Sequence, residues 1–111
     1  MVTMGYSNLG NGIYGLEAEA DFEAWVDPLD DPWDFRYGLT IHDTNSFEWA
    51  RNSGSFSLNP GSQTTWSSDT FNGPSTSSSG VYNAVAGIEG RYTGAGEYDL
   101  LEFEAANVTI P

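Results

Sequence analysis

The stretch that decides the fold of this chain is Leu16-Glu17-Ala18-Glu19-Ala20-Asp21-Phe22-Glu23-Ala24-Trp25-Val26-Asp27. Apolar residues alternate along it with carboxylates, and Trp25 takes the place of one carboxylate. A period of two residues puts the two sets on opposite faces of a β-strand. Glutamate and alanine favour helices, but a helix here would carry both residue types on every side and would have no apolar stripe. The stretch therefore predicts a long strand with its acidic face in solvent.

Weaker segments of the same kind follow. Apolar and aromatic residues predict further strands at 35–42, 47–49, 56–58, 64–66, 81–92 and 97–110. Loops are predicted at 27–34 and 67–80, and the alternation slips near Leu100-Leu101, which indicates a β-bulge. No stretch shows a period of 3.6 over ten residues, so under about a tenth of the chain is expected in helix. The predicted fold class is all-β, an antiparallel, immunoglobulin-like β-sandwich of about seven to eight strands with an extended N-terminal arm.

The 111 residues fit a single domain. Residues 1–15 are rich in glycine and lack the regular alternation of a core strand. We expect them to form an arm that is ordered by burial against a neighbour, while residues 16–111 form one sandwich domain. The alternative is that the arm folds back on its own sandwich. The residues expected to point inward are Leu16, Ala18, Ala20, Phe22, Tyr37, Leu39, Ile41, Phe56 and Leu58.

The charge of the chain excludes several classes of partner. Sixteen acidic residues stand against three arginines and no lysine, which gives a net charge of −13. A nucleic-acid binder needs a basic surface, and an anionic membrane would repel this chain. The absence of cysteine excludes disulfides and thiol chemistry. Many carboxylates without lysine are typical of proteins from extreme halophiles, and an ordinary acidic domain is the alternative.

One hairpin carries a family resemblance. Its residues are Phe56-Ser57-Leu58-Asn59-Pro60-Gly61-Ser62-Gln63-Thr64-Thr65-Trp66. This segment resembles the L-x-P-G hairpin of small immunoglobulin-like surface domains of the CARDB type, which are common in bacterial and archaeal cell-surface proteins. The acidic first strands and the glycine-rich arm depart from that pattern. The resemblance implies adhesion or structural spacing and supplies no site residues.

A cluster of aspartates makes one loop a candidate for calcium. Calcium takes six to eight oxygen ligands, and four carboxylates fall within eight residues at Asp27, Asp30, Asp31 and Asp34. The spacing is not that of an EF-hand. The alternative is a solvated turn in which the aspartates cap local amides, so no cofactor and no metal are predicted beyond these candidates.

Aromatic residues are numerous for a chain of this size. Trp25 lies on the polar face of the first predicted strand, and Trp33 lies in a loop. Exposed aromatic residues stack on sugar rings or form subunit contacts, where tryptophan and tyrosine are enriched. The residues predicted to bind a protein partner are Tyr6, Leu9, Ile13, Tyr14, Trp25 and Trp33.

No catalytic motif is found in the sequence. His42 and Asp43 are neighbours on a predicted strand, so their side chains point to opposite faces. The G-x-S-x-G sequence of serine hydrolases is missing, and we predict that the protein is not an enzyme. Asn107-Val108-Thr109 matches the glycosylation sequence, which matters only in a compartment that glycosylates.

These observations lead to two expectations for function. The first is a non-catalytic structural subunit of an extracellular assembly, most plausibly a virion surface or accessory protein (capsid decoration or tail) of a haloarchaeal virus. It would form a homo-oligomer or dock on a major capsid or tail protein, without nucleic acid. The second is a carbohydrate- or ligand-binding cell-surface module. No secretory signal and no membrane span are predicted, and a virion protein needs no signal because lysis releases it.

Overall fold

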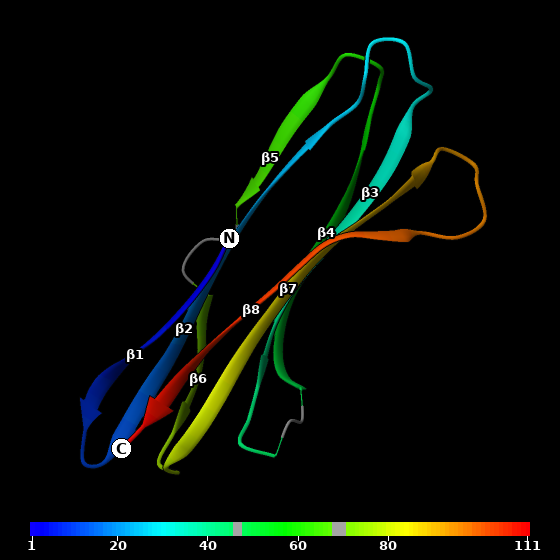
Figure 1. Cartoon of the computed structure of the whole chain (residues 1–111). Coiled ribbons are helices and arrows are strands. Elements are labelled where there is room, and N and C mark those ends of the chain that lie inside the picture. The colour runs from blue at the N-terminus through cyan, green and yellow to red at the C-terminus, as the bar shows by residue number, and fades with distance from the viewer. Residues whose placement is uncertain (46–47, 68–70) are drawn as a thin grey trace.

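The computed structural model describes residues 1–45, 48–67 and 71–111, with side chains at all of these except 48–52, 66–67 and 71–74. The described residues form strands and turns and contain no helix. The strands are β1 (Val2–Gly10), β2 (Ile13–Trp25), β3 (Trp33–His42), β4 (Glu48–Leu58), β5 (Gln63–Ser67), β6 (Phe71–Thr76), β7 (Gly80–Tyr92) and β8 (Asp99–Ile110). Every pairing between them is antiparallel, which confirms the predicted all-β sandwich (Figure 1).

Two sheets of four strands form the sandwich. In the first sheet β2 is the central strand, with β1 on one side and both β5 and β6 on the other. Strand β2 is long enough to hold two partners in line, because β6 pairs with its first half and β5 with residues 21–25. The second sheet has the order β4-β3-β7-β8. Together they make an elongated body of 56 × 22 × 16 Å (Figure 1).

The core lies between the inner faces of the two sheets, where the alternation of β2 places it. Six of the residues expected to point inward are buried, and the remaining three, Tyr37, Phe56 and Leu58, are partly buried against the core. The acidic residues of β2 occupy its opposite, outer face, as the sequence predicts. Much of the core is made of alanine from β2 and β7, which lets the sheets approach closely.

The N-terminal segment differs from the expectation. Residues 2–10 form β1, which pairs with β2 from Val2 opposite Ala20 to Gly10 opposite Ile13. The turn between the strands is Asn11-Gly12, and both residues have positive φ angles, 56° and 74°, as two-residue hairpins favour. The prediction of an arm outside the sandwich is therefore wrong. The Asn-Gly pair is the signal that identifies this hairpin.

Two further boundaries are corrected. The strands predicted at 47–49 and 56–58 belong to one strand, β4, because β3 offers a continuous edge along its whole length; Phe47 lies outside the described residues. The loop predicted at 67–80 contains β6, which pairs with β2. The predicted bulge is confirmed, since the register of β7 with β8 shifts where Leu101 is inserted between Leu100 and Glu102.

Candidate interaction surfaces

The six residues predicted to bind a partner lie in two groups, far apart in the sandwich. Tyr6, Leu9, Ile13 and Tyr14 surround the turn between β1 and β2, where the rings of Tyr6 and Tyr14 meet edge to face at 5.5 Å. Trp25 and Trp33 stand at the far ends of β2 and β3, on either side of the 27–32 loop. The structure therefore does not join the six residues in one surface.

Of the two tryptophans, only Trp25 presents its ring to solvent. It lies on the outer face of β2 with 58% of its surface exposed. Trp33 is half-buried, and its ring centroid lies 4.4 Å from that of Tyr92 and 6.1 Å from that of Phe35. Its Nε1 also donates a hydrogen bond of 3.2 Å to Asp30. Trp33 is thus part of the sandwich wall, whereas Trp25 is exposed on the outer face of β2.

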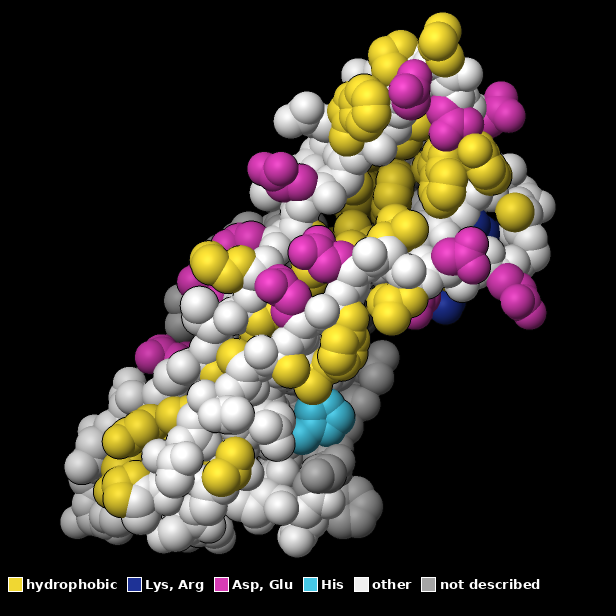
Figure 2. All heavy atoms as spheres, viewed as in Figure 1, with side chains coloured by type: hydrophobic (Ala, Val, Ile, Leu, Met, Phe, Trp, Pro, Cys, Tyr) yellow, Lys and Arg dark blue, Asp and Glu magenta, His cyan; other side chains and the backbone are white. Residues whose placement is uncertain are grey.

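The end of the sandwich that carries Trp25 exposes several large apolar side chains. We call this region the open end: residues 22–25 of β2, the loop 27–32, Tyr92, and residues 99–103 of β8. Figure 2 shows apolar side chains in the hollow between the two sheets there. The large apolar residues exposed in this region are Trp25, Leu29, Tyr92, Leu100, Leu101 and Phe103.

At the open end, β2 extends past its pairing with β1. Strand β1 pairs with β2 as far as Ala20, which lies opposite Val2, while β2 continues to Trp25. The Met1 ammonium group donates to the carbonyl of Asp21 at 2.6 Å and forms an ion pair with Glu104 of β8 at 2.6 Å.

The four aspartates weighed as calcium ligands do not converge. Asp27 accepts a hydrogen bond from the amide of Leu29, and Asp30 accepts from the amide of Asp31, each at 2.9 Å. The bond from the Asp31 amide is the main reason that the pKa of Asp30 lies below its usual value. Asp34 belongs to a separate network. Within the described residues, no group of three or more carboxylates or imidazoles is arranged to hold a metal ion.

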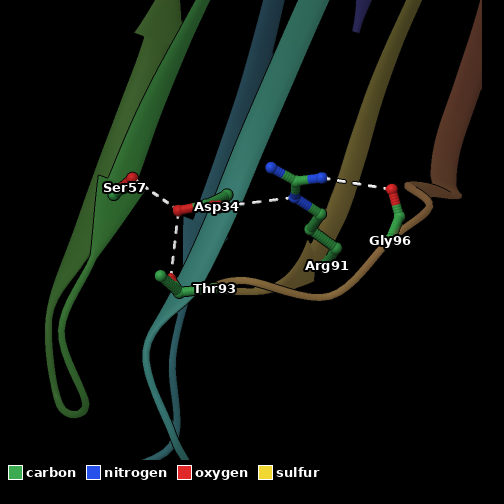
Figure 3. Close-up of polar contacts among 5 residues, drawn as sticks. All are labelled: Asp34, Ser57, Arg91, Thr93 and Gly96. Atoms are coloured by element: carbon green, nitrogen blue, oxygen red, sulfur yellow. Dashed lines mark hydrogen bonds and ion pairs between the residues drawn. The ribbon is translucent and has the colours of Figure 1, made fainter.

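Asp34 ties three strands and a hairpin loop together (Figure 3). Its carboxylate accepts hydrogen bonds from Ser57 of β4 at 2.7 Å and from Thr93 at 3.0 Å, and it pairs with Arg91 of β7 at 3.4 Å. Arg91 in turn donates to the carbonyl of Gly96 at 3.2 Å. The hydrogen bond from Ser57, followed by those from Thr93 and Arg91, holds the pKa of Asp34 below its usual value.

Replacing Asp34 with asparagine is expected to lower the free energy of unfolding at neutral pH, and this effect should shrink in acid. The pKa of Asp34 is lower in the folded state than in the unfolded state. Its carboxylate therefore stabilises the folded state fully above the unfolded-state pKa of about 4. This stabilisation is lost as the pH falls through the folded-state pKa. Chemical denaturation of both proteins at fixed salt measures the difference. Asp99→Asn, at an exposed position of β8, is the control. If the difference in the free energy of unfolding between the wild type and Asp34→Asn stays constant below about pH 4, this explanation is contradicted.

A shallow groove runs over the outer face of the second sheet. Gly38 of β3 and Gly87 of β7 face each other in register and form its floor. Phe103 of β8 lines one wall, and an ion pair between Arg36 and Glu89 is also part of the lining. The groove has a volume of about 570 Å³. It combines an apolar wall with polar groups, an arrangement that small ligands use.

Beside this groove, the ring of Tyr98 stacks against two of the three arginines. The guanidinium carbons of Arg36 and Arg91 lie 4.2 and 4.4 Å from the centroid of its ring. The stack fixes the loop between β7 and β8 against the outer face of the sheet. Sequence reasoning missed this cluster, because its members meet only through the pairing of β3 with β7.

The histidine weighed for catalysis contacts a hydroxyl on its own strand. His42 Nε2 lies 2.9 Å from the hydroxyl of Thr40, which also donates to the carbonyl of Val85 at 3.3 Å. Asn107 is exposed on β8. Nothing helical in the described part of the chain has the length and apolar character needed to cross a membrane.

Comparison with known proteins adds one structural likeness. No protein-family model matches the sequence, and no curated protein matches it. A crystal structure of a protein from Archaeoglobus fulgidus is similar over 98% of this chain and 94% of that chain, with a TM-score of 0.43 and 11% identity. The arrangement of the strands assigns the fold class: the protein is an antiparallel β-sandwich, and its described residues form eight strands.

Proposed function

We propose that the protein is a non-catalytic structural subunit that docks on other protein subunits through its open end. The observation that supports this is the exposure of large apolar side chains among the carboxylates of that end. Trp25 and Leu101 are each at least half exposed there, although both are large apolar residues. Exposed large apolar residues are candidates for protein contact, and tryptophan is a frequent anchor of such contacts.

The setting that we propose is the surface of an extracellular assembly in high salt. A net charge of −13 without lysine supports it, since repulsion at that charge density weakens a compact state unless salt screens it. We propose a surface or accessory protein (capsid decoration or tail) of a haloarchaeal virion, present as a homo-oligomer or docked on a major capsid or tail protein. The elongated shape fits a spacer or decorating subunit.

Single substitutions test the docking role better than truncation. Deleting residues 1–14 would remove β1 and expose the edge of β2, so loss of assembly would not be separable from loss of the fold. Trp25→Ser and Leu9→Ser both replace a large exposed apolar residue, with 58% and 61% exposure, but only Trp25 lies at the open end.

The protein as isolated from its native particles or extract, at the salt of that extract, is expected to sediment as a complex heavier than the monomer. Trp25→Ser should shift it to the monomer, because the contact loses its aromatic anchor, and Leu9→Ser should sediment like the wild type. A wild-type protein that is monomeric in native particles and extracts would rule the proposal out.

The groove on the second sheet supports the alternative, a carbohydrate- or ligand-binding module. Phe103 is 58% exposed beside the floor formed by Gly38 and Gly87, and a sugar ring could lie against it. Isothermal titration calorimetry with soluble oligosaccharides tests this alternative. Binding that is weakened by Phe103→Ala supports it, and the absence of heat for all sugars tried contradicts it.

A further inference from the structure

We propose that the groove on the outer face of the second sheet binds an uncharged, extended glycan chain, which lies across the strands from β8 to β4. This proposal deepens the alternative function stated above and rests on it. It is independent of docking through the open end. It adds the direction of the glycan chain, its lack of charge and the residues that contact it.

Rows of residues in register across the second sheet build the groove. The floor is the row that crosses the sheet at its facing glycines: Ser53, Gly38, Gly87 and Phe103. One wall is the next row, which contains an ion pair: Ser55, Arg36, Glu89 and Leu100. Thr40 and Val85 lie on the other side of the floor. Because neighbouring strands are about 4.8 Å apart, the floor is about 14 Å long, which gives room for a few sugar units in a straight line.

The chain's own conformation does not require the glycines of the floor. Neither Gly38 nor Gly87 has a positive φ angle, so other residues could adopt the backbone conformation at both positions. Chain neighbours aside, a Cβ atom added to Gly87 would have the carbonyl oxygen of Glu102 as its nearest atom, at 3.4 Å, which is an ordinary contact. Glycine weakens the interior of a strand, and it marks places where a ligand approaches the backbone closely. The low floor is therefore suited to something outside the chain.

The β8 end of the groove is apolar. The Cβ atom added to Gly87 would lie 3.7 Å from Leu100 Cδ1 and 3.9 Å from Phe103 Cδ2, so these two side chains flank the space above the floor. Leu100 is 61% exposed and Phe103 is 58% exposed. A sugar ring has an apolar face of C–H groups and carries its hydroxyl groups around the rim. Such a face can cover Leu100 and Phe103 while the hydroxyl groups point toward the walls and the solvent.

The rest of the lining supplies partners for those hydroxyl groups. Arg36 Nε donates to Glu89, and the guanidinium carbon of Arg36 lies 4.2 Å from the centroid of the Tyr98 ring, so two contacts fix the plane of the guanidinium group. Its terminal amino groups can donate to a ligand, and the Glu89 carboxylate can accept from one. Ser53 and Ser55, both exposed, offer hydroxyl groups at the β4 end. A purely apolar ligand would leave all these polar groups unpaired.

The charges in the groove favour an uncharged chain. Among the described residues that line the groove, Arg36 and Glu89 are the charged ones, and they form an ion pair with each other. A carboxylate or an ammonium group that entered the groove would lose part of its hydration without meeting an unpaired opposite charge. The net charge of −13 also repels polyanions at low salt. An uncharged glycan avoids both costs.

The test uses the full-length protein at the lowest salt concentration at which its circular dichroism shows a folded β-sheet. The probe is cellohexaose, an uncharged β-1,4-linked chain that is flat and extended. Two relatives of this sugar serve as comparisons. Maltohexaose is its α-1,4-linked isomer, which is curved, and the hexamer of cellouronic acid is the same extended chain with a carboxylate on each unit. Titrations followed by NMR of the protein's amide groups measure the three affinities.

We expect cellohexaose to bind and to shift the amide signals of Gly38 and Gly87. Maltohexaose should bind at least about fivefold more weakly, because a curved chain leaves polar groups at one end of the floor unpaired. The cellouronic acid hexamer should bind at least about tenfold more weakly, because its carboxylates lose hydration without gaining a partner. No binding of cellohexaose, or an equal or higher affinity for either comparison sugar, would overturn the proposal.

Protein variants locate the site. Gly87→Val raises the floor, and Asn83→Val is the matched control, because Asn83 lies on the same face of β7 but outside the groove. Valine is a good strand former, so both variants should fold. Cellohexaose should bind at least about tenfold more weakly to Gly87→Val than to Asn83→Val, since a raised floor keeps the sugar from the backbone. Equal binding to the two variants would overturn the proposal.

Gly87→Ala adds only the Cβ atom and keeps the test decisive if the valine variant does not fold. It should melt no lower than the wild type, because glycine weakens a strand, and it should still bind cellohexaose more weakly. A lower melting temperature with unchanged binding would show that Gly87 serves the packing of Phe103 and would overturn the proposal. If the cellouronic acid hexamer binds more tightly than cellohexaose, this proposal fails and the ligand-binding alternative remains. Sedimentation of the native protein tests docking through the open end separately.

Discussion

Replacing Leu39 with alanine is expected to lower the free energy of unfolding by about 2–5 kcal/mol, as in other fully buried leucines. Leu39 has no exposed surface and lies in β3, between β4 and β7. The core around it is rich in alanine, with Ala86 directly across the pairing with β7. Short side chains cannot swing into the vacated space, so we expect the upper part of the range. Chemical denaturation at fixed salt measures the change.

The control for this prediction is Leu9→Ala, which removes the same atoms from a residue that is 61% exposed. Its effect should stay within about 0.5 kcal/mol. A domain of this size has a total stability on the order of 10 kcal/mol, so Leu39→Ala should remove a substantial part of it. Equal effects of the two substitutions would show that the interior between the sheets is not closely packed.

Chloride salts are expected to stabilise the protein steeply between about 0.1 M and about 2 M, a range in which the Debye length falls from about 10 Å to below 3 Å. Alternate residues on the outer face of β2 are about 7 Å apart, so each neighbouring pair of carboxylates repels by about 0.6 kcal/mol in water before screening. With sixteen acidic residues and three arginines, many such pairs act together. The melting temperature in a chloride series measures the effect.

A double variant separates screening of charge from general salting out. Glu19→Gln and Glu23→Gln remove two carboxylates from the outer face of β2, both exposed, without touching the core. The double variant should be more stable than the wild type at low salt, and the two melting temperatures should converge at high salt. A melting temperature that does not change over the chloride series would remove the support for a high-salt setting.

The fold could be predicted where one strand carries its own pattern. Strand β2 alternates so strictly that its inner and outer faces are assigned correctly residue by residue. Strand β6 was missed because Gly73 and Pro74 are poor strand formers, and its place is set by pairing with β2. Strand β1 was missed because glycine and polar residues dilute its apolar positions. Both β1 and β6 form because they pair with β2, not because of their own sequence pattern.

The candidate surface was accessible to sequence reasoning only in part. Trp25 is identifiable from the sequence because an aromatic residue interrupts an acidic face. The role of Trp33 depends on Tyr92, which β7 brings to its side, and no local pattern links the two. Strand β2, with 13 residues, is longer than β1, with 9. Such a difference becomes visible only when the register is known.

The order in which β2 finds its neighbours has a consequence for synthesis of the chain. Its first partner, β1, precedes it, but β5 and β6 emerge only after β3 and β4 have been made. At ordinary rates of translation, one edge of β2 therefore stays bare for a time on the order of seconds. A bare, half-apolar strand invites pairing with other nascent chains. The four carboxylates on the outer face of β2 repel those chains, so residues that define the strand also protect it from aggregation during synthesis.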